Sequence, residues 1–69
     1  MMYFVIYEKT AMGFSAYVPD LPGCVAAGST LEDTRAKMRE AVEFHLDGMR
    51  EDGTPIPFPS TVAAEEMAV

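Results

Sequence analysis

The feature that most constrains this sequence is that a short chain has no means of cross-linking itself. Its 69 residues include one cysteine and one histidine, so neither an intrachain disulfide nor a zinc site of cysteines and histidines can form. A chain of this length buries only about 60% of the surface that its unfolded form exposes. The core must therefore be small, and self-association is the remaining way to bury more apolar surface. We expect at least a homodimer.

The charge balance indicates which partners suit the chain. Eleven carboxylates against five lysines and arginines give a formal net charge of −6 at pH 7. Binding to a phosphate backbone needs a basic surface, so direct DNA binding is not expected of this chain alone, and a basic protein is the better match. One free thiol suits the reducing cytoplasm. The N-terminal run 1–7 is too short for a signal or membrane-spanning segment.

Three short segments are predicted to form β-strands. Residues 2–8 and 13–18 are rich in aromatic and β-branched residues and flank a short connection that ends in glycine, which is typical of a β-hairpin. Residues 19–23 contain two prolines and a glycine and predict a turn. Residues 24–28 then form a candidate third strand, whose small side chains favour close packing against a helix.

The first predicted strand is apolar on both of its faces. Alternate side chains of a strand point to opposite sides of the sheet. The side chains on one face are Tyr3, Val5 and Tyr7, and those on the other are Phe4 and Ile6. A sheet face in contact with water would alternate apolar with polar residues. We therefore expect that each face of the sheet is covered.

A single amphipathic helix is predicted to follow Ser29 or Thr30, either of which can cap it, and to run to about Asp52, with Gly53 closing it. At 100° per residue, its apolar stripe consists of Leu31, Met38, Ala41, Val42, His45, Leu46 and Met49. Its opposite, acidic stripe consists of Glu40, Glu43, Asp47 and Glu51. Phe44 lies at the margin of the acidic stripe, where an aromatic residue indicates an oligomer contact.

The last part of the chain is predicted to be extended. Prolines at every second position from 55 to 59 remove backbone donors and exclude a helix or a central strand. Ile56 and Phe58 lie between these prolines and are expected to dock on the core. Residues 61–62 form a candidate edge strand, and residues 63–69 a weak helix or frayed tail. We expect one domain over residues 1–62, a short tail over 63–69, and no DNA-binding domain.

Few residues are candidates for catalysis. His45 lies on the apolar stripe, where a lone histidine is most often a packed core or interface residue. Cys24 has no basic flank and no second histidine in the sequence to lower its pKa, so we expect a small buried side chain. The acids that a residual metal-dependent nuclease would use are Glu8, Asp20 and Asp33. Asp20 lies in the predicted turn and Asp33 in the first turn of the predicted helix, and these local positions are sufficient to explain both acids. We therefore expect no enzyme activity, no cofactor and no metal site.

Four motifs occur together between residues 13 and 60, in a combination more specific than any one of them. They are GFSAYVPDLPGC at 13–24, GSTLED at 28–33, EFHL at 43–46 and GTPIPFPS at 53–60. Through these motifs the chain closely resembles the HicB family of bacterial antitoxins. The resemblance implies an α+β fold in which one helix covers a three-stranded antiparallel sheet, with a candidate short fourth strand. Such a fold is related to a partial ribonuclease H fold without its active site.

The resemblance also implies a function. HicB proteins neutralise a HicA-type toxin, a small basic ribonuclease that cuts messenger RNA through a histidine, by direct contact and commonly as dimers or tetramers. The expected partner or oligomer contacts are Tyr3, Tyr7, Tyr17, Phe44, Glu40, Glu43 and Asp47. Many HicB proteins also carry a C-terminal segment that binds operator DNA, which is not expected here. The alternatives are a stand-alone oligomeric regulator without a toxin and a residual metal-dependent nuclease.

Overall fold

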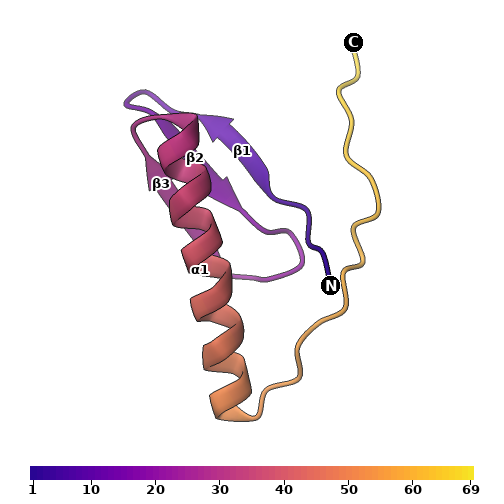
Figure 1. Cartoon of the computed structure of the whole chain (residues 1–69). Helices are drawn as coiled ribbons and strands as arrows, with labels where there is room; N and C mark the ends of the chain where they lie inside the picture. Colours follow the sequence, from indigo (N-terminus) through magenta and orange to yellow (C-terminus); the bar gives the residue numbers. More distant parts are fainter.

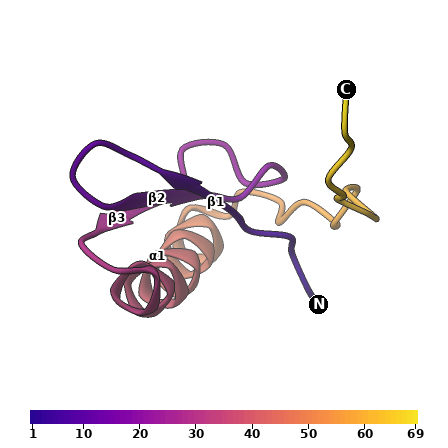
Figure 2. The same cartoon turned by 90° about the horizontal axis from the view of Figure 1, so that it is seen from above.

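The computed structural model describes all 69 residues and contains three strands followed by one helix. The elements are β1 (Ile6–Lys9), β2 (Phe14–Tyr17), β3 (Val25–Gly28) and α1 (Leu31–Asp52). The sheet is antiparallel, with β2 at its centre between β1 and β3. α1 lies across one face of this sheet (Figure 1 and Figure 2). The predicted α+β fold, with a three-stranded antiparallel sheet and one helix, is confirmed.

The strands are shorter than the sequence predicts. Pairing between β1 and β2 begins at Ile6, whose partner is Tyr17, the last residue of β2. Pro19 follows two positions later, and proline has no backbone N–H to donate to a ladder. β2 therefore ends early, and residues 2–5 have no partner strand. At the other end of the hairpin, the Thr10 amide donates to the Gly13 carbonyl at 2.8 Å.

α1 begins and ends at the predicted capping residues. Thr30 is the N-cap, and its Oγ1 accepts a hydrogen bond from the Asp33 amide at 3.0 Å. The Asp33 carboxylate accepts in turn from the Ser29 amide at 3.4 Å. Gly53 has a left-handed φ of 69°, and its N–H donates to the Arg50 carbonyl. None of the helical structure combines the length and the apolar character that crossing a membrane requires.

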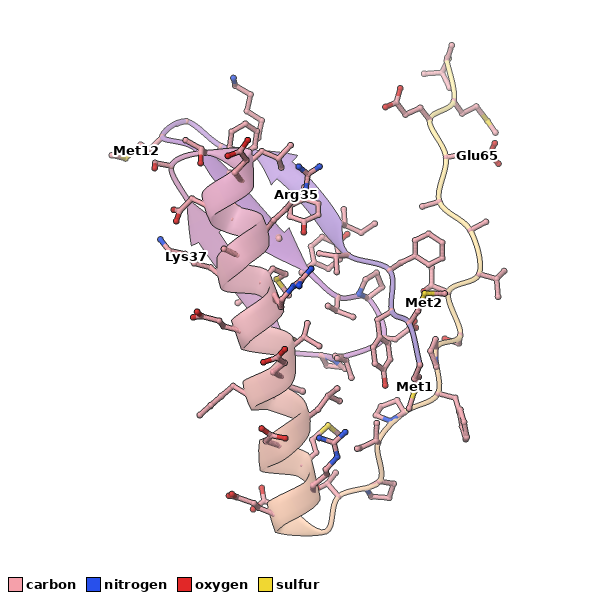
Figure 3. The ribbon with its side chains drawn as sticks, viewed as in Figure 1. Met1, Met2, Met12, Arg35, Lys37 and Glu65 are labelled. Carbon is pink, nitrogen blue, oxygen red and sulfur yellow. The ribbon has the colours of Figure 1, made fainter.

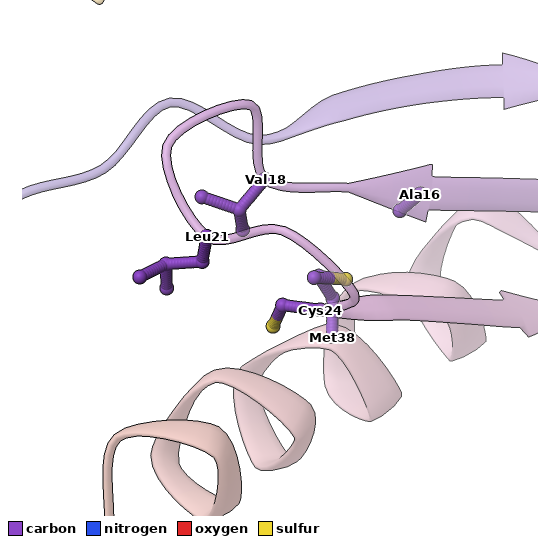
Figure 4. Close-up of a cluster of buried hydrophobic side chains, with 5 residues drawn as sticks. All are labelled: Ala16, Val18, Leu21, Cys24 and Met38. Atoms are coloured by element: carbon purple, nitrogen blue, oxygen red, sulfur yellow. The ribbon is translucent and has the colours of Figure 1, made fainter. Parts of the chain in front are cut away.

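The core is small and lies between the sheet, the β2–β3 loop and α1 (Figure 4). Its buried hydrophobic residues are Ala16, Val18, Leu21, Cys24 and Met38. Burial raises the pKa of the Cys24 thiol, so this side chain stays protonated and packs as a small apolar group, as predicted. The predicted apolar stripe of α1 is buried or half-buried throughout, and the predicted acidic stripe is exposed.

α1 approaches β3 closely at Gly28. A Cβ atom at this position would lie 2.8 Å from Thr34 Oγ1 and 3.0 Å from the Thr34 amide, so a larger residue would force the helix away. Thr34 is fully buried, and its hydroxyl donates to the Thr30 carbonyl at 2.7 Å. Thr34 was absent from the predicted apolar stripe because it is polar. The small side chains of residues 24–28 were the only sequence signal of this close contact.

Residues 54–69 leave α1 as an extended segment (Figure 1). The Tyr3 hydroxyl donates to the Pro57 carbonyl. The Asp20 carboxylate accepts from the Ser60 hydroxyl at 2.8 Å and from the Thr61 amide at 3.2 Å. The predicted edge strand at residues 61–62 is wrong, because the Thr61 amide donates to the Asp20 side chain and not to a neighbouring strand. A helix over residues 63–69 is also wrong, since this stretch is extended.

The expected docking of Ile56 and Phe58 is correct only in part. Ile56 is half-buried, whereas Phe58 is 86% exposed. Chains rich in proline favour a conformation with three residues per turn, so side chains two positions apart point in different directions. Only one of the two can therefore face the core.

The contribution of the core can be measured with a matched pair of methionine variants. Met38→Ala removes a side chain that is 1% exposed and should lower the free energy of unfolding by about 2–5 kcal/mol. Met12→Ala makes the same change at a side chain that is 93% exposed and should alter it by less than about 0.5 kcal/mol. Urea denaturation measures both changes. Equal midpoints for the two variants would contradict this packing.

The attachment of the C-terminal segment should depend on pH. The Ser60 hydroxyl and the Thr61 amide hydrogen-bond to Asp20 and lower the pKa of its carboxyl. This attachment should therefore be fully present above the unfolded-state pKa of about 3.9 and lost as the pH falls through the lowered folded-state value. At neutral pH, Asp20→Asn should speed hydrogen exchange of the Thr61 amide severalfold, whereas Asp52→Asn should not. Unchanged exchange in Asp20→Asn would show that the carboxylate does not hold the segment.

Candidate partner-binding surfaces

The exposed stripe of α1 carries acids that the chain's own cations do not neutralise. The two ion pairs of the structure are Lys37–Asp33 at 3.1 Å and Arg50–Asp47 at 2.9 Å. Glu40 and Glu43 take part in neither pair. Lys37 is already bound by Asp33, and neither glutamate forms an ion pair with Arg39, so the negative potential of these two glutamates remains available to a partner.

A shallow groove runs between β3 and α1, beside this acidic stripe. Its lining residues are Val25, Ala26, Lys37, Glu40, Ala41, Glu43, Phe44 and Asp47, and it is termed the acidic groove. Phe44 is 82% exposed, so the groove presents a large aromatic side chain to solvent. An aromatic residue surrounded by polar groups is typical of the residues that contribute most to binding at protein interfaces.

β3 forms one edge of the sheet next to the acidic groove. Its sequence is Val-Ala-Ala-Gly, with no charged residue and no proline. Charged residues and prolines are the usual means of preventing an edge strand from pairing with another chain. A partner in the acidic groove can therefore contact the side chains of α1 and the free backbone edge of β3 together.

A second groove lies on the other side of α1, between the helix and the N-terminal segment that leads into β1. Its lining residues are Met1, Met2, Tyr3, Val5, Tyr7, Arg35, Met38, Arg39, Val42, Glu43, Leu46 and Arg50. It includes all three arginines of the chain and is termed the arginine groove. The Arg35 guanidinium lies 5.6 Å from the centre of the Tyr7 ring, a cation–π distance.

The sheet face opposite α1 has no helix over it (Figure 2). Ile6, Tyr17 and Val25 are cross-strand neighbours on this open sheet face. The residues that pack against the core from the other face are Tyr3, Val5 and Tyr7. The expectation that each face is covered is therefore met on one side only, because the chain supplies a single helix.

The structure distributes the predicted contact residues over these three surfaces. Those in the acidic groove are Phe44, Glu40, Glu43 and Asp47. Tyr3 and Tyr7 line the arginine groove, which Glu43 also borders, and Tyr17 lies on the open sheet face. Val25 was not predicted as a contact residue. Its β-branched side chain indicated a strand, but the sequence did not reveal that this strand lies at an edge.

Comparison with known protein families decides the classification. Residues 3–68 match the family described as the HicB-like antitoxin of the bacterial toxin-antitoxin system. The chain belongs to the HicB-like antitoxin family. The resemblance inferred from the four sequence motifs is thereby confirmed.

Two individual relatives are similar to most of this HicB-like chain. An uncharacterized 14.9 kDa protein of Haemophilus phage HP1 is 42% identical over 57 residues, which are 83% of the chain and 43% of the phage protein. Antitoxin HicB 2 of Photorhabdus laumondii is 34% identical over 61 residues, which are 88% of the chain and 44% of that antitoxin. The HicB-like chain thus spans less than half the length of these two relatives.

A solved structure is similar over most of the chain. One chain of a HicA3 and HicB3 toxin-antitoxin complex matches the HicB-like chain with a TM-score of 0.77 and 35% sequence identity. The match covers 90% of the HicB-like chain and 72% of that chain. The helix-on-sheet arrangement described above is therefore shared with a chain of a toxin-antitoxin complex.

Two of the three acids named in the nuclease alternative, Asp20 and Asp33, have local partners in the HicB-like chain. Asp20 binds the C-terminal segment. Asp33 binds Lys37, whose hydrogen bond and positive charge lower the pKa of the Asp33 carboxyl. No three histidine, cysteine or acidic side chains lie close enough together to hold a metal ion. The structure therefore does not bring Glu8, Asp20 and Asp33 together in one cluster.

Proposed function

We propose that this HicB-like chain binds and neutralises a small, basic, HicA-type toxin that cleaves messenger RNA, and that the acidic groove makes the contact. The similarity to a chain of a HicA3 and HicB3 complex supports a toxin of this type. The observation that carries the choice of surface is the exposed Phe44 within a rim of uncompensated carboxylates.

The electrostatics of the acidic groove suit a basic partner. The net charge of −6 attracts a cation-rich protein at long range, and Glu40 and Glu43 supply unpaired carboxylates at the groove. Such complementarity raises the association rate and selects among partners more than it raises affinity. The attraction should weaken with added salt, because exposed charges are screened beyond about 8 Å at physiological ionic strength.

Phe44 supplies the apolar part of the proposed contact. Its ring is exposed and is absent from the set of residues packed in the core, so a partner that covers it removes apolar surface from water without disturbing the fold. Aromatic residues at the centre of an interface commonly cost about 2 kcal/mol or more when truncated. The acidic rim and the aromatic residue thus have separate roles, one in steering and one in affinity.

Neutralisation would follow from occupying the toxin's RNA-binding surface. A ribonuclease holds its substrate largely through positive charges that contact phosphates. An acidic protein bound to the same charges excludes RNA by competition, and this requires no chemical step from the HicB-like chain. We place the interaction in the cytoplasm, where messenger RNA is translated.

The chain is further proposed to act as a homodimer or homotetramer. Its core has only five buried hydrophobic residues, which is a small basis for stability. Both grooves and the open sheet face leave apolar side chains in contact with water. Association between copies is the means of burying this surface that the chain itself provides.

Variants at two exposed phenylalanines test the proposed contact. Phe44→Ala should weaken inhibition of toxin-catalysed RNA cleavage by about 30-fold, as expected for loss of a central aromatic contact. Phe58→Ala makes the same change at a side chain that is 86% exposed and outside both grooves, and it should inhibit like the original chain. Titration of each chain into a cleavage assay with a HicA-type toxin measures the difference.

Two results would count against the proposal. Undiminished RNA cleavage at a large excess of the original chain would contradict the antitoxin function. Equal inhibition by Phe44→Ala and Phe58→Ala would leave that function standing but exclude the acidic groove as the contact surface.

A further inference from the structure

The last residues of the chain carry apolar and acidic side chains that are exposed to solvent (Figure 3). Val62 and Met67 are exposed large hydrophobic residues. Glu65 and Glu66 are exposed and take part in neither ion pair. A segment with this mixture of groups is complementary to a surface that is apolar at its centre and basic at its rim.

The arginine groove is such a surface. Val5, Val42 and Leu46 are half-buried and give it an apolar floor. Arg35 and Arg39 border it, and neither forms an ion pair within the chain. In a chain with more than twice as many acids as bases, two arginines without a carboxylate partner are available for an acidic segment.

The dimensions of the segment and the groove agree. From Arg35 to Arg50, α1 rises by about 22 Å at 1.5 Å per residue. The extended residues 62–69 span about 26 Å at 3.3 Å per residue. Residues 62–69 can therefore follow the groove along its length.

The chain's own C-terminal segment is held away from its own arginine groove. In both views the N-terminal segment lies between α1 and residues 62–69 (Figure 1 and Figure 2). The bonds of Pro57 to Tyr3 and of Thr61 to Asp20 fix the segment on this outer side. Entry into its own groove would require crossing the N-terminal segment, whereas the groove of another copy has no such obstacle.

We infer that residues 62–69 of one copy dock in the arginine groove of a second copy, with Glu65 and Glu66 next to Arg35 and Arg39. The exchange is reciprocal, so it closes a twofold dimer with two equivalent contacts. This inference rests on the proposed self-association and identifies the surface that produces it. The acidic groove on the other side of α1 remains open to the toxin.

Reversal of the acidic pair tests the inference. Glu65→Arg with Glu66→Arg should raise the dimer dissociation constant by about tenfold or more, because each of two contacts exchanges attraction for repulsion. Glu51→Arg with Asp52→Arg makes the same change in net charge at two adjacent, exposed acids that line neither groove, and it should leave the constant unchanged. Analytical ultracentrifugation measures the constant, and circular dichroism checks that each variant is folded.

A charge exchange between the two surfaces makes the test specific. Arg35→Glu with Arg39→Glu should weaken the dimer as much as the reversal at residues 65 and 66, and combining all four changes in one chain should restore it. If both double variants form weaker dimers and the chain with all four changes does not regain the original dissociation constant, a direct contact is contradicted. If neither pair of substitutions changes the dimer dissociation constant, the interface lies elsewhere. If the original chain is a monomer at micromolar concentration, the proposed self-association is overturned as well. Toxin inhibition is judged separately, through Phe44→Ala.

Discussion

The packing of α1 against one face of the sheet is the interaction on which the rest of the structure depends. Met38 closes the core from the helix side, and Thr34 fits against β3 where Gly28 leaves room. The single helix covers a single sheet face, so the opposite face and both flanks of α1 stay in contact with water. The candidate binding surfaces are thus a direct result of how little this chain can bury.

The charges of α1 divide between its two flanks. Toward β3, the cation Lys37 is bound by Asp33, which leaves Glu40 and Glu43 free. Toward the N-terminal segment, Arg35 and Arg39 are the free charges. A basic toxin and an acidic segment of a second copy would therefore bind on different sides of one helix. The two grooves share only Glu43, so self-association and toxin binding would compete for one lining residue at most.

Features fixed by local chemistry were predictable from the sequence, and those fixed by tertiary contacts were not. Thr30 and Gly53 cap α1 as expected, since capping depends on a few neighbouring residues. The position of β3 at the sheet edge, which joins Val25 to Phe44 in one groove, depends on strand order and has no local signal. Phe58 was wrongly expected in the core, because alternating prolines reveal an extended chain but not which side chain faces inward.

The central claim is that the acidic groove is the surface that binds the toxin. The most direct test is to record the backbone amide chemical shifts of the isotope-labelled HicB-like chain while a HicA-type toxin is added. The account predicts the largest changes in β3 and around Phe44, with small changes at Tyr7 in the arginine groove. Changes confined to β1 and the N-terminal segment, with β3 and Phe44 unaffected, would contradict it.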